Sequence, residues 1–302
     1  MILSVCISPC IDVTTYIDKQ GNCIKEQSVA CGGKGVNVAV GIKRLGGDAI
    51  LSGVMFEKDK ELFSDYLKSE GVENSFVLET GSVRKNYKYY DGETLVEKNA
   101  MATEISARAA QEVLHNIRTI SKNSEVTVLS GSLPKNLSAI FYKEMAEAVD
   151  KKAALIVDAT GENLLQALQA NRTIDLVKPN LQELEQTTNI KICDITSLKT
   201  ACRVLVNAGA RCVLVSLGKD GAIITDGDRY CYAKSEHKAV NSTVGAGDAL
   251  VAAVTIQLEK SESLESILRA SVAAGTAKIR DNLTKIEYEK IYSEICLKEI
   301  EK

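Results

Sequence analysis

The sequence has few of the residues on which several common kinds of site depend. Among 302 residues there are two histidines, three prolines and no tryptophan. His115 and His237 are too few and too far apart in the chain to suggest an imidazole-based triad or a metal cluster, so we expect both to be structural or surface residues. The chain also has no internal repeat, low-complexity segment or proline-rich linker that would separate two domains.

Cysteine is present, but not in a pattern typical of zinc sites or disulfide frameworks. The chain has nine cysteines, an odd number, and no C-x-x-C pair. The sequence therefore predicts reduced thiols, most of them small residues of the core. They lie at positions 6, 10, 23, 31, 193, 202, 212, 231 and 296.

The chain has neither a large excess of one charge nor a long hydrophobic run. Its net charge of -3 argues against a surface built mainly to bind nucleic acid. No uncharged apolar run is long enough to span a bilayer, and no basic segment precedes the apolar residues 2–7. We therefore expect a cytoplasmic protein without a secretory or membrane signal, and no membrane partner.

Hydrophobic periodicity predicts alternating strands and helices through most of the chain. This alternation is typical of a parallel sheet that is covered by helices on both faces. The length permits one large domain, and we expect a single domain over residues 1–302. Strands are expected over 2–7, 49–54, 126–129, 154–157, 174–177 and 212–217, a strand hairpin over 221–233, and helices over 36–45, 58–70, 103–120, 137–150, from 162, from 180, over 196–208 and from 248 onward.

Two segments depart from this pattern and predict a small separate sheet. Residues 13–17 and 26–30 alternate as short strands, and a later stretch rich in tyrosine and charge contains Asp91-Gly92 as a hairpin turn signal. We expect these strands to pair as a lid that projects from the main body. The lid is inserted in two pieces, at about residues 12–31 and 83–98.

Polar residues follow the predicted strands, at the ends where a doubly wound sheet binds its ligands. One such cluster means little, but five in series indicate a substrate crevice. They are Ser8 with Asp12, Ser130-Gly-Ser132, Asp158, Lys178-Pro-Asn180 and Ser216-Leu-Gly218.

The stretch Asn241-Ser-Thr-Val-Gly-Ala-Gly-Asp-Ala-Leu250 is a glycine-rich turn that leads into a helix. Gly245 and Gly247 allow a ligand to approach backbone N–H groups, and the N-terminus of a helix favours a phosphoryl group. Asp248 falls in the first helical turn. From these residues alone it is either an ordinary acid that complements the helix dipole or a general base beside an anion-binding turn.

A second glycine-rich turn, Cys31-Gly-Gly-Lys-Gly35, precedes another predicted helix. It lacks the spacing of a P-loop, so it is either a flexible turn or a second phosphate-compatible one. On the lid, strand alternation places Arg84, Asn86 and Lys88 on one face. Such a face is usually a solvated edge, but its position over a crevice favours an anionic substrate, because arginine can hold a phosphate through two hydrogen bonds.

Together these residues resemble the PfkB (ribokinase-like) family of sugar kinases over essentially the whole chain. Its two signatures are matched by Gly32-Gly-Lys-Gly-Val-Asn-Val-Ala39, followed by Leu45-Gly-Gly47, and by Asn241-Ser-Thr-Val-Gly-Ala-Gly-Asp-Ala249. The resemblance implies a ribokinase-like three-layer α/β/α domain with a mostly parallel central sheet and a small β-sheet lid.

Within the family the sequence looks most like the phosphosugar branch, which includes 1-phosphofructokinase and tagatose-6-phosphate kinase. Ser8-Pro-Cys-Ile-Asp12 is similar to the Asn-Pro-Ala-x-Asp start of that branch but departs from it at Ser8 and Cys10, so only Asp12 is carried over. The other motifs that fit are Arg84-Lys-Asn-Tyr-Lys88, Leu129-Ser-Gly-Ser-Leu-Pro134, Asp158-Ala-Thr-Gly161 and Lys178-Pro-Asn-Leu-Gln-Glu183.

The resemblance implies magnesium-dependent transfer of the γ-phosphoryl group of ATP to a hydroxyl of a sugar phosphate. Asp248 would take the hydroxyl proton, while the backbone N–H groups of Gly245, Ala246 and Gly247 hold the phosphoryl group. The glycine-rich turn before Asp248 suits this reaction, because a loose transition state depends on positioning and charge stabilisation more than on covalent chemistry.

The resemblance also implies which residues hold the ligands. The expected contacts of the sugar hydroxyls are Asp12, Gly33 and Asn37, with Asn86 beside them on the lid, and the candidates for the substrate phosphate are Lys34, Arg84, Lys88 and Ser132. The nucleotide would be lined by Asn180, Ser216, Gly218, Gly221 and Thr243. Mg²⁺ would be bound through water by Asn180 and Glu183. Two of these assignments have alternatives: the side chains of Lys34 and Lys88 could be solvated instead of binding phosphate, and Glu183 could be an ordinary acid at the start of a helix.

We expect the reaction to convert fructose 1-phosphate to fructose 1,6-bisphosphate. The alternative substrate is tagatose 6-phosphate or fructose 6-phosphate. A neutral sugar or nucleoside is disfavoured, because it would leave Arg84 and Lys88 without a phosphate partner. A dehydrogenase is disfavoured because no G-x-G-x-x-G follows the first strand. A catalytically inactive nucleotide sensor is disfavoured because the chain retains Asp248. We also expect a homodimer formed through the exposed face of the lid, since an open sheet favours pairing.

Overall fold

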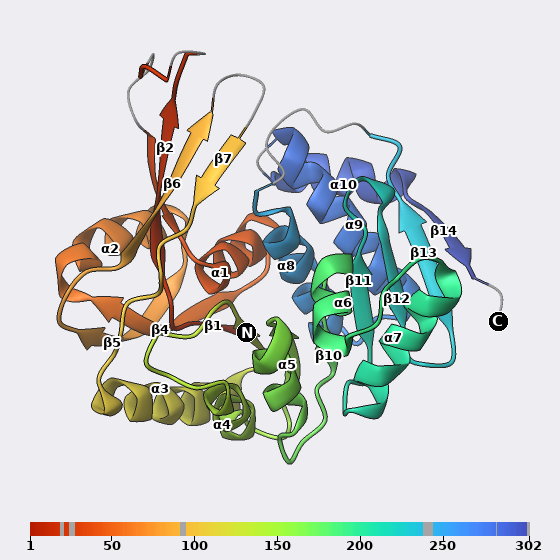
Figure 1. Ribbon diagram of the computed structural model, residues 1–302, viewed down its shortest axis with the longest axis horizontal. Helices are drawn as coiled ribbons and strands as arrows, with labels where there is room; N and C mark the ends of the chain where they lie inside the picture. Colours follow the sequence, from red (N-terminus) through yellow and green to blue (C-terminus); the bar gives the residue numbers. More distant parts are fainter. Residues whose placement is uncertain (19–20, 24–27, 91–94, 238–243, 282, 301–302) are drawn as a thin grey trace.

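Two β-sheets organise the chain (Figure 1). The computed structural model describes residues 1–302 except 19–20, 24–27, 91–94, 238–243, 282 and 301–302. The larger sheet contains β1 (Ile2–Cys6), β4 (Ala49–Phe56), β5 (Glu73–Glu79), β8 (Val126–Ser130), β9 (Ala154–Asp158), β10 (Leu176–Val177), β11 (Val213–Ser216), β12 (Ala222–Thr225), β13 (Tyr230–Lys234) and β14 (Cys296–Glu299).

The strand order of this sheet is β14-β13-β12-β11-β10-β9-β8-β1-β4-β5. Pairing is parallel from β5 to β11 and antiparallel from β11 to β14. The central strands β1 and β8 are buried along their whole lengths, as expected of strands covered on both faces. The predicted, mostly parallel sheet is confirmed.

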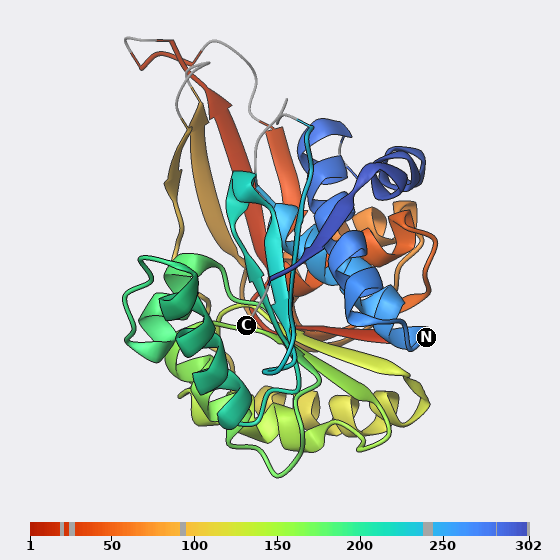
Figure 2. The same ribbon diagram turned by 90° about the vertical axis from the view of Figure 1, so that its right-hand side faces the viewer.

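Helices cover both faces of the larger sheet (Figure 2). One face carries α1 (Lys34–Arg44), α8 (Ala246–Glu259) and α9 (Leu264–Asp281), with α10 (Lys285–Glu294) outside α9. The opposite face carries α3 (Ala107–Ile120), α4 (Ile140–Ala148), α5 (Gly161–Leu168), α6 (Leu181–Thr188) and α7 (Ile195–Asn207). Residues 248–257 of α8 are all buried, so this helix lies inside the molecule.

The smaller sheet is the predicted lid. Its strands are β2 (Cys10–Tyr16), β3 (Ser28–Gly32), β6 (Arg84–Tyr90) and β7 (Leu95–Lys98), in the order β3-β2-β6-β7. In Figure 1, β2, β6 and β7 rise above the rest of the molecule, near α2 (Lys60–Ser69). The predicted hairpin is confirmed as the antiparallel pair of β6 and β7, whereas its turn signal Asp91-Gly92 lies outside the described residues.

Two strands were not predicted, and both lie at the edges of the larger sheet. β5 has the sequence Glu-Asn-Ser-Phe-Val-Leu-Glu and β14 has the sequence Cys-Leu-Lys-Glu, so neither has a clear apolar alternation. An edge strand has one neighbour and needs fewer apolar side chains, which weakens its signal in the sequence. β10 is also shorter than the predicted 174–177, because Ile174 forms only an isolated bridge with Ala210.

The cysteines agree with the predicted reduced thiols. All nine belong to the described part of the chain, and none of them forms a disulfide. Cys6, Cys10, Cys31, Cys202 and Cys231 are buried. The histidines also agree with the prediction, since His115 is exposed on α3 and His237 contacts Glu294 on the surface. Among the described residues, none of the helices is both long and apolar enough to cross a membrane.

Candidate active site

The N-terminus of α8 is the centre of the candidate site. Gly245 is its N-cap and has a φ of 78°, a left-handed conformation that a side chain disfavours. Ala246, Gly247 and Asp248 form the first turn, whose backbone N–H groups have no partner within the helix. These donors and the helix dipole make the turn suitable for an anion.

Asp248 is buried at this turn and is held from another helix. Nδ2 of Asn37, on α1, donates a hydrogen bond of 2.7 Å to Oδ2 of Asp248. The start of α1 is itself set by Gly33, which has a φ of 117° and lies so close to the segment after β1 that a Cβ atom on it would be 3.1 Å from Cα of Pro9. The two predicted glycine-rich turns therefore meet in space.

The surroundings of Asp248 favour a proton acceptor that works near neutral pH. Burial, and then the negative charge of Asp158, raise the pKa of Asp248 to about 6. The hydrogen bond from Asn37 and the charges of Lys34 and Lys178 oppose this rise. A carboxylate with this pKa is ionised at pH 7 yet more basic than a surface aspartate, as general-base catalysis requires.

A buried ionic cluster lies close to Asp248. Oδ1 of Asp158, at the end of β9, lies 3.2 Å from Nζ of Lys34 and 3.3 Å from Nζ of Lys178. Burial opposes the ionisation of Asp158, but the two ammonium groups hold its pKa below the usual value. Lys34 is likewise kept charged, because Asp158, Glu183 and Asp248 raise its pKa against the effect of burial.

The cluster contains two residues to which sequence reasoning gave no role. In the sequence, Asp158 and Lys178 stand out as polar residues after strands and as the first residues of two motifs that fit the phosphosugar branch, but neither has an assigned role. A Cβ atom built on Gly247 would lie 3.7 Å from Nζ of Lys178, so this lysine reaches the anion-binding turn. The signal in the sequence for a role of Lys178 is its position after a buried strand and directly before Pro179 and Asn180. The contact with Gly247 depends on the sheet order and was not visible in the sequence.

The lid carries a second carboxylate, that of Asp12, which is held by its neighbours on β6. β2 and β6 are parallel, and Asp12 is opposite Asn86 in the register. Nδ2 of Asn86 donates a 3.0 Å hydrogen bond to Oδ1 of Asp12, and Nζ of Lys88 donates a 2.7 Å hydrogen bond to Oδ2. Asn86 and Lys88 thus share one face of β6, as predicted, and together they fix the carboxylate of Asp12.

The other two predicted phosphate contacts come from different elements, because Arg84 begins β6 and Ser132 follows β8. Nη1 of Arg84 donates to the carbonyl of Ala100 at 3.1 Å, but no described residue accepts a hydrogen bond from its buried Nε. The hydroxyl of Ser132 lies 3.4 Å from that of Ser8. Lys34 and Lys88 are each paired with a carboxylate. The Nε of Arg84 differs in being a buried donor for which no described residue supplies an acceptor.

The predicted nucleotide residues gather at the ends of β10 and β11. Asn180 and Glu183 form a capping box at the start of α6, with hydrogen bonds of 2.8 and 2.9 Å. Asn180 also forms a bridge with Ser216. Gly218 and Gly221 bound the short turn between β11 and β12. Thr243, predicted to contact the nucleotide, lies outside the described residues.

The carboxylate oxygens of Asp158 and Glu183 fit a magnesium ion that is bound largely through water and phosphate. No hydrogen bond from a described residue reaches the buried Oδ2 of Asp158, and only one carboxylate oxygen of Glu183 is used in the capping box. Among the described residues there is no cluster of three metal-binding side chains. Mg²⁺ prefers one or two carboxylates with several waters and substrate oxygens, which agrees with this sparse set.

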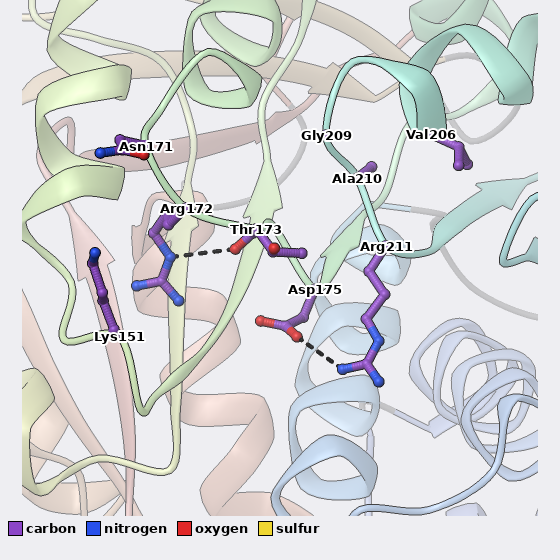
Figure 3. Close-up of a pocket in the computed structure, with 9 residues that line it drawn as sticks. All are labelled: Lys151, Asn171, Arg172, Thr173, Asp175, Val206, Gly209, Ala210 and Arg211. Atoms are coloured by element: carbon purple, nitrogen blue, oxygen red, sulfur yellow. Dashed lines mark hydrogen bonds and ion pairs between the residues drawn. The ribbon is translucent and has the colours of Figure 1, made fainter.

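A separate cavity of about 740 Å³ lies away from these residues (Figure 3). Its lining residues precede β9, β10 and β11, so it lies at the amino ends of these strands, opposite the ends that carry Asp158 and Asn180. Arg172 is engaged by backbone carbonyls, including that of Ala153 at 2.7 Å, and Arg211 pairs with Asp175 at 3.5 Å. These contacts connect loops of the protein and offer no group comparable to Asp248.

Comparisons with known proteins give matches along essentially the whole chain. The model of the pfkB family of carbohydrate kinases matches residues 1–290. A 1-phosphofructokinase of Borreliella burgdorferi is 30% identical, over 98% of this chain and 97% of the relative. A tagatose-6-phosphate kinase of Staphylococcus epidermidis is 25% identical, over 99% of this chain and 100% of the relative. The tetrameric inhibited form of phosphofructokinase-2 from Escherichia coli superposes with a TM-score of 0.90, at 28% identity, over 97% of this chain and 98% of that one.

Proposed function

The chain belongs to the pfkB family of carbohydrate kinases, and from this premise we propose that it transfers the γ-phosphoryl group of ATP to a hydroxyl of a ketohexose phosphate. The observation that carries the proposal is the buried Asp248 at the N-terminus of α8, held by Asn37 beside an anion-binding turn. A general base and a set of backbone donors then lie within one helical turn.

In the proposed reaction, Asp248 accepts the proton of the sugar hydroxyl. The hydroxyl oxygen forms a bond to the γ-phosphorus of ATP while the bond to the bridging oxygen of ADP breaks. The N–H groups of Gly245, Ala246 and Gly247 hold the oxygens of the transferring group. Lys178 approaches the same turn and balances the negative charge that gathers there.

The proposed magnesium site uses Asn180 and Glu183 through water, with Asp158 as a further oxygen donor near the turn. When bound, Mg²⁺ neutralises charge on the phosphates of ATP. The capping box serves this role by fixing the carboxylate of Glu183 at the start of α6. Ser216, Gly218, Gly221 and Thr243 are the proposed nucleotide contacts.

The proposed sugar contacts are Asp12, Gly33, Asn37 and Asn86, and the proposed phosphate contacts are Arg84 and Ser132, with Lys34 and Lys88 nearby. The uncommitted Nε of Arg84 favours a phosphorylated substrate, since a buried donor without an acceptor is unfavourable. We propose fructose 1-phosphate as the acceptor, in agreement with the Borreliella burgdorferi relative. Tagatose 6-phosphate is the alternative, in agreement with the Staphylococcus epidermidis relative, and fructose 6-phosphate is a further one.

Release of ADP by the purified protein tests this proposal. The acceptors are fructose 1-phosphate, tagatose 6-phosphate, fructose 6-phosphate, ribose and adenosine, each supplied with ATP and Mg²⁺. We expect turnover with one or more of the ketohexose phosphates and the highest kcat/KM with fructose 1-phosphate. Turnover of ribose or adenosine alone would contradict the assignment to phosphosugars.

We also propose that the protein forms a homodimer through the lid. Val29, Tyr87 and Val96 are 57%, 40% and 53% exposed, and strand register places all three on the face away from Asp12. An apolar face of this kind is costly to leave in water. We further propose one kinase domain over residues 1–302. We also propose a cytoplasmic location, which suits nine cysteines that form no disulfide.

A further inference from the structure

Lys278 lies beside the turn that begins α8, although neither glycine-rich signature contains it. It belongs to α9, which packs along α8. A Cβ atom built on Gly245 would lie 3.2 Å from Cε of Lys278. The end of this lysine side chain therefore rests against the residue that caps the proposed phosphoryl-binding turn.

The charges around Lys278 come from four separate parts of the chain. Arg44 on α1 and Lys88 on β6 repel its charge, whereas Asp248 on α8 and Glu70 after α2 attract it. Burial, followed by the repulsion from Arg44, lowers the pKa of Lys278. Arg44 and Lys88 each have a carboxylate partner, Glu70 and Asp12, and still repel the partly buried ammonium group of Lys278. An anion bound beside Lys278 would offset this repulsion.

We propose that Lys278 supplies a fixed positive charge beside the N-terminus of α8, where it stabilises the phosphoryl group during transfer. This inference rests on the proposed kinase function. The backbone N–H groups of the turn offer only partial charges, and a full charge at the same place adds to them as negative charge develops. The same charge favours the ionised form of Asp248, so Lys278 also helps to keep the base ready.

Lys278→Met tests the role of the charge, because methionine retains an unbranched apolar stem and removes only the ammonium group. We expect kcat to fall by about 10² to 10³-fold, as for the loss of one transition-state donor. Lys278→Arg keeps the charge and is expected to stay within about tenfold of the parent protein, on the same reasoning. The matched control is Lys260→Met, at the exposed C-terminal end of α8, which should leave kcat unchanged.

The pH profile separates an electrostatic role from a purely structural one. If Lys278 acts on Asp248 through its charge, the acid limb of kcat/KM moves to higher pH in Lys278→Met and stays in place in Lys278→Arg and Lys260→Met. A kcat within twofold of the parent, together with an unmoved acid limb, would overturn the proposal. Should Lys278→Met not fold, Lys278→Gln provides the same comparison.

A binding measurement distinguishes failure of this inference from failure of the proposed function. Calorimetry with ATP and Mg²⁺ needs no sugar and no turnover. We expect Lys278→Met, or Lys278→Gln, to bind ATP at least tenfold more weakly than the parent, while Lys260→Met binds equally well. If the parent phosphorylates no ketohexose phosphate, the proposed function fails and this comparison still decides the role of Lys278. Equal affinity of parent and variant in that case would overturn it.

Discussion

The amide of Asn37 and the carboxylate of Asp248 are joined by a hydrogen bond of 2.7 Å, although 211 residues separate them in the chain. This bond links the first turns of α1 and α8, the two helices that follow the glycine-rich signatures. It holds one carboxylate oxygen of Asp248, and we propose that the other oxygen accepts the proton of the substrate hydroxyl. The position of the proposed base is therefore set by two helices rather than by its own turn alone.

Asp248→Asn is expected to abolish most of the turnover and to preserve substrate binding. Asparagine has nearly the same shape and can still accept a hydrogen bond from Asn37, but it cannot take the hydroxyl proton. Loss of a general base costs about 10² to 10⁴-fold in kcat, and misplacement of the substrate adds to this. Steady-state kinetics and calorimetry with ATP measure the two effects. Near-parental turnover would remove Asp248 from the mechanism.

The activity of the parent protein is expected to decline as the pH falls through about 6, the value to which the pKa of Asp248 is raised. The base must be ionised to accept a proton, so protonation of Asp248 causes the loss. Asn37→Ala removes a hydrogen bond that favours the ionised form. We expect it to move the acid limb of kcat/KM upward by about one pH unit, which corresponds to about 1.4 kcal/mol.

Asn86→Ala is the matched control for this shift. It also deletes an amide that donates to an aspartate, but that aspartate is Asp12 and not the base. We expect Asn86→Ala to raise KM for the sugar phosphate and to leave the acid limb in place. An acid limb that does not respond to Asn37→Ala would show that another group controls the pH dependence.

Arg84→Met is expected to weaken recognition of the substrate phosphate. The variant keeps much of the apolar stem and loses the uncommitted Nε donor. A charge-assisted hydrogen bond contributes about 1.5–3 kcal/mol, so kcat/KM for the sugar phosphate should fall by about 10 to 150-fold. Affinity for ATP should not change, and Lys85→Met, on the opposite face of β6, serves as the control. An equal loss in both variants would place the phosphate elsewhere.

Tyr87→Glu is expected to convert the proposed dimer to a monomer. It puts a charge on the outer, apolar face of the lid, where a dimer interface would have to bury it. Light scattering at micromolar concentration measures the mass of the parent and the variant. Ile286→Glu, at an 83% exposed position on α10, is the control and should keep the parental mass. A monomeric parent protein would contradict the lid interface.

The sequence determined the features that depend on local pattern. The spacing of apolar residues predicted most strands of the larger sheet and the helices that cover it. The tyrosine-rich stretch predicted the hairpin of the lid. The turn around Gly245 was visible because a left-handed N-cap demands glycine. Asp248 followed from its place directly after that turn. The edge strands β5 and β14 were missed because a strand with one neighbour carries little hydrophobic alternation.

Only the tertiary structure decided which distant residues meet. The cluster of Asp158 with Lys34 and Lys178 depends on β1, β8, β9 and β10 being neighbours in that order, and local periodicity does not specify strand order. The approach of Lys278 to Gly245 depends in the same way on the packing of α9 along α8. The sequence identified the carboxylate at the start of α8. Its raised pKa comes from burial and from charges that only the folded chain brings around it.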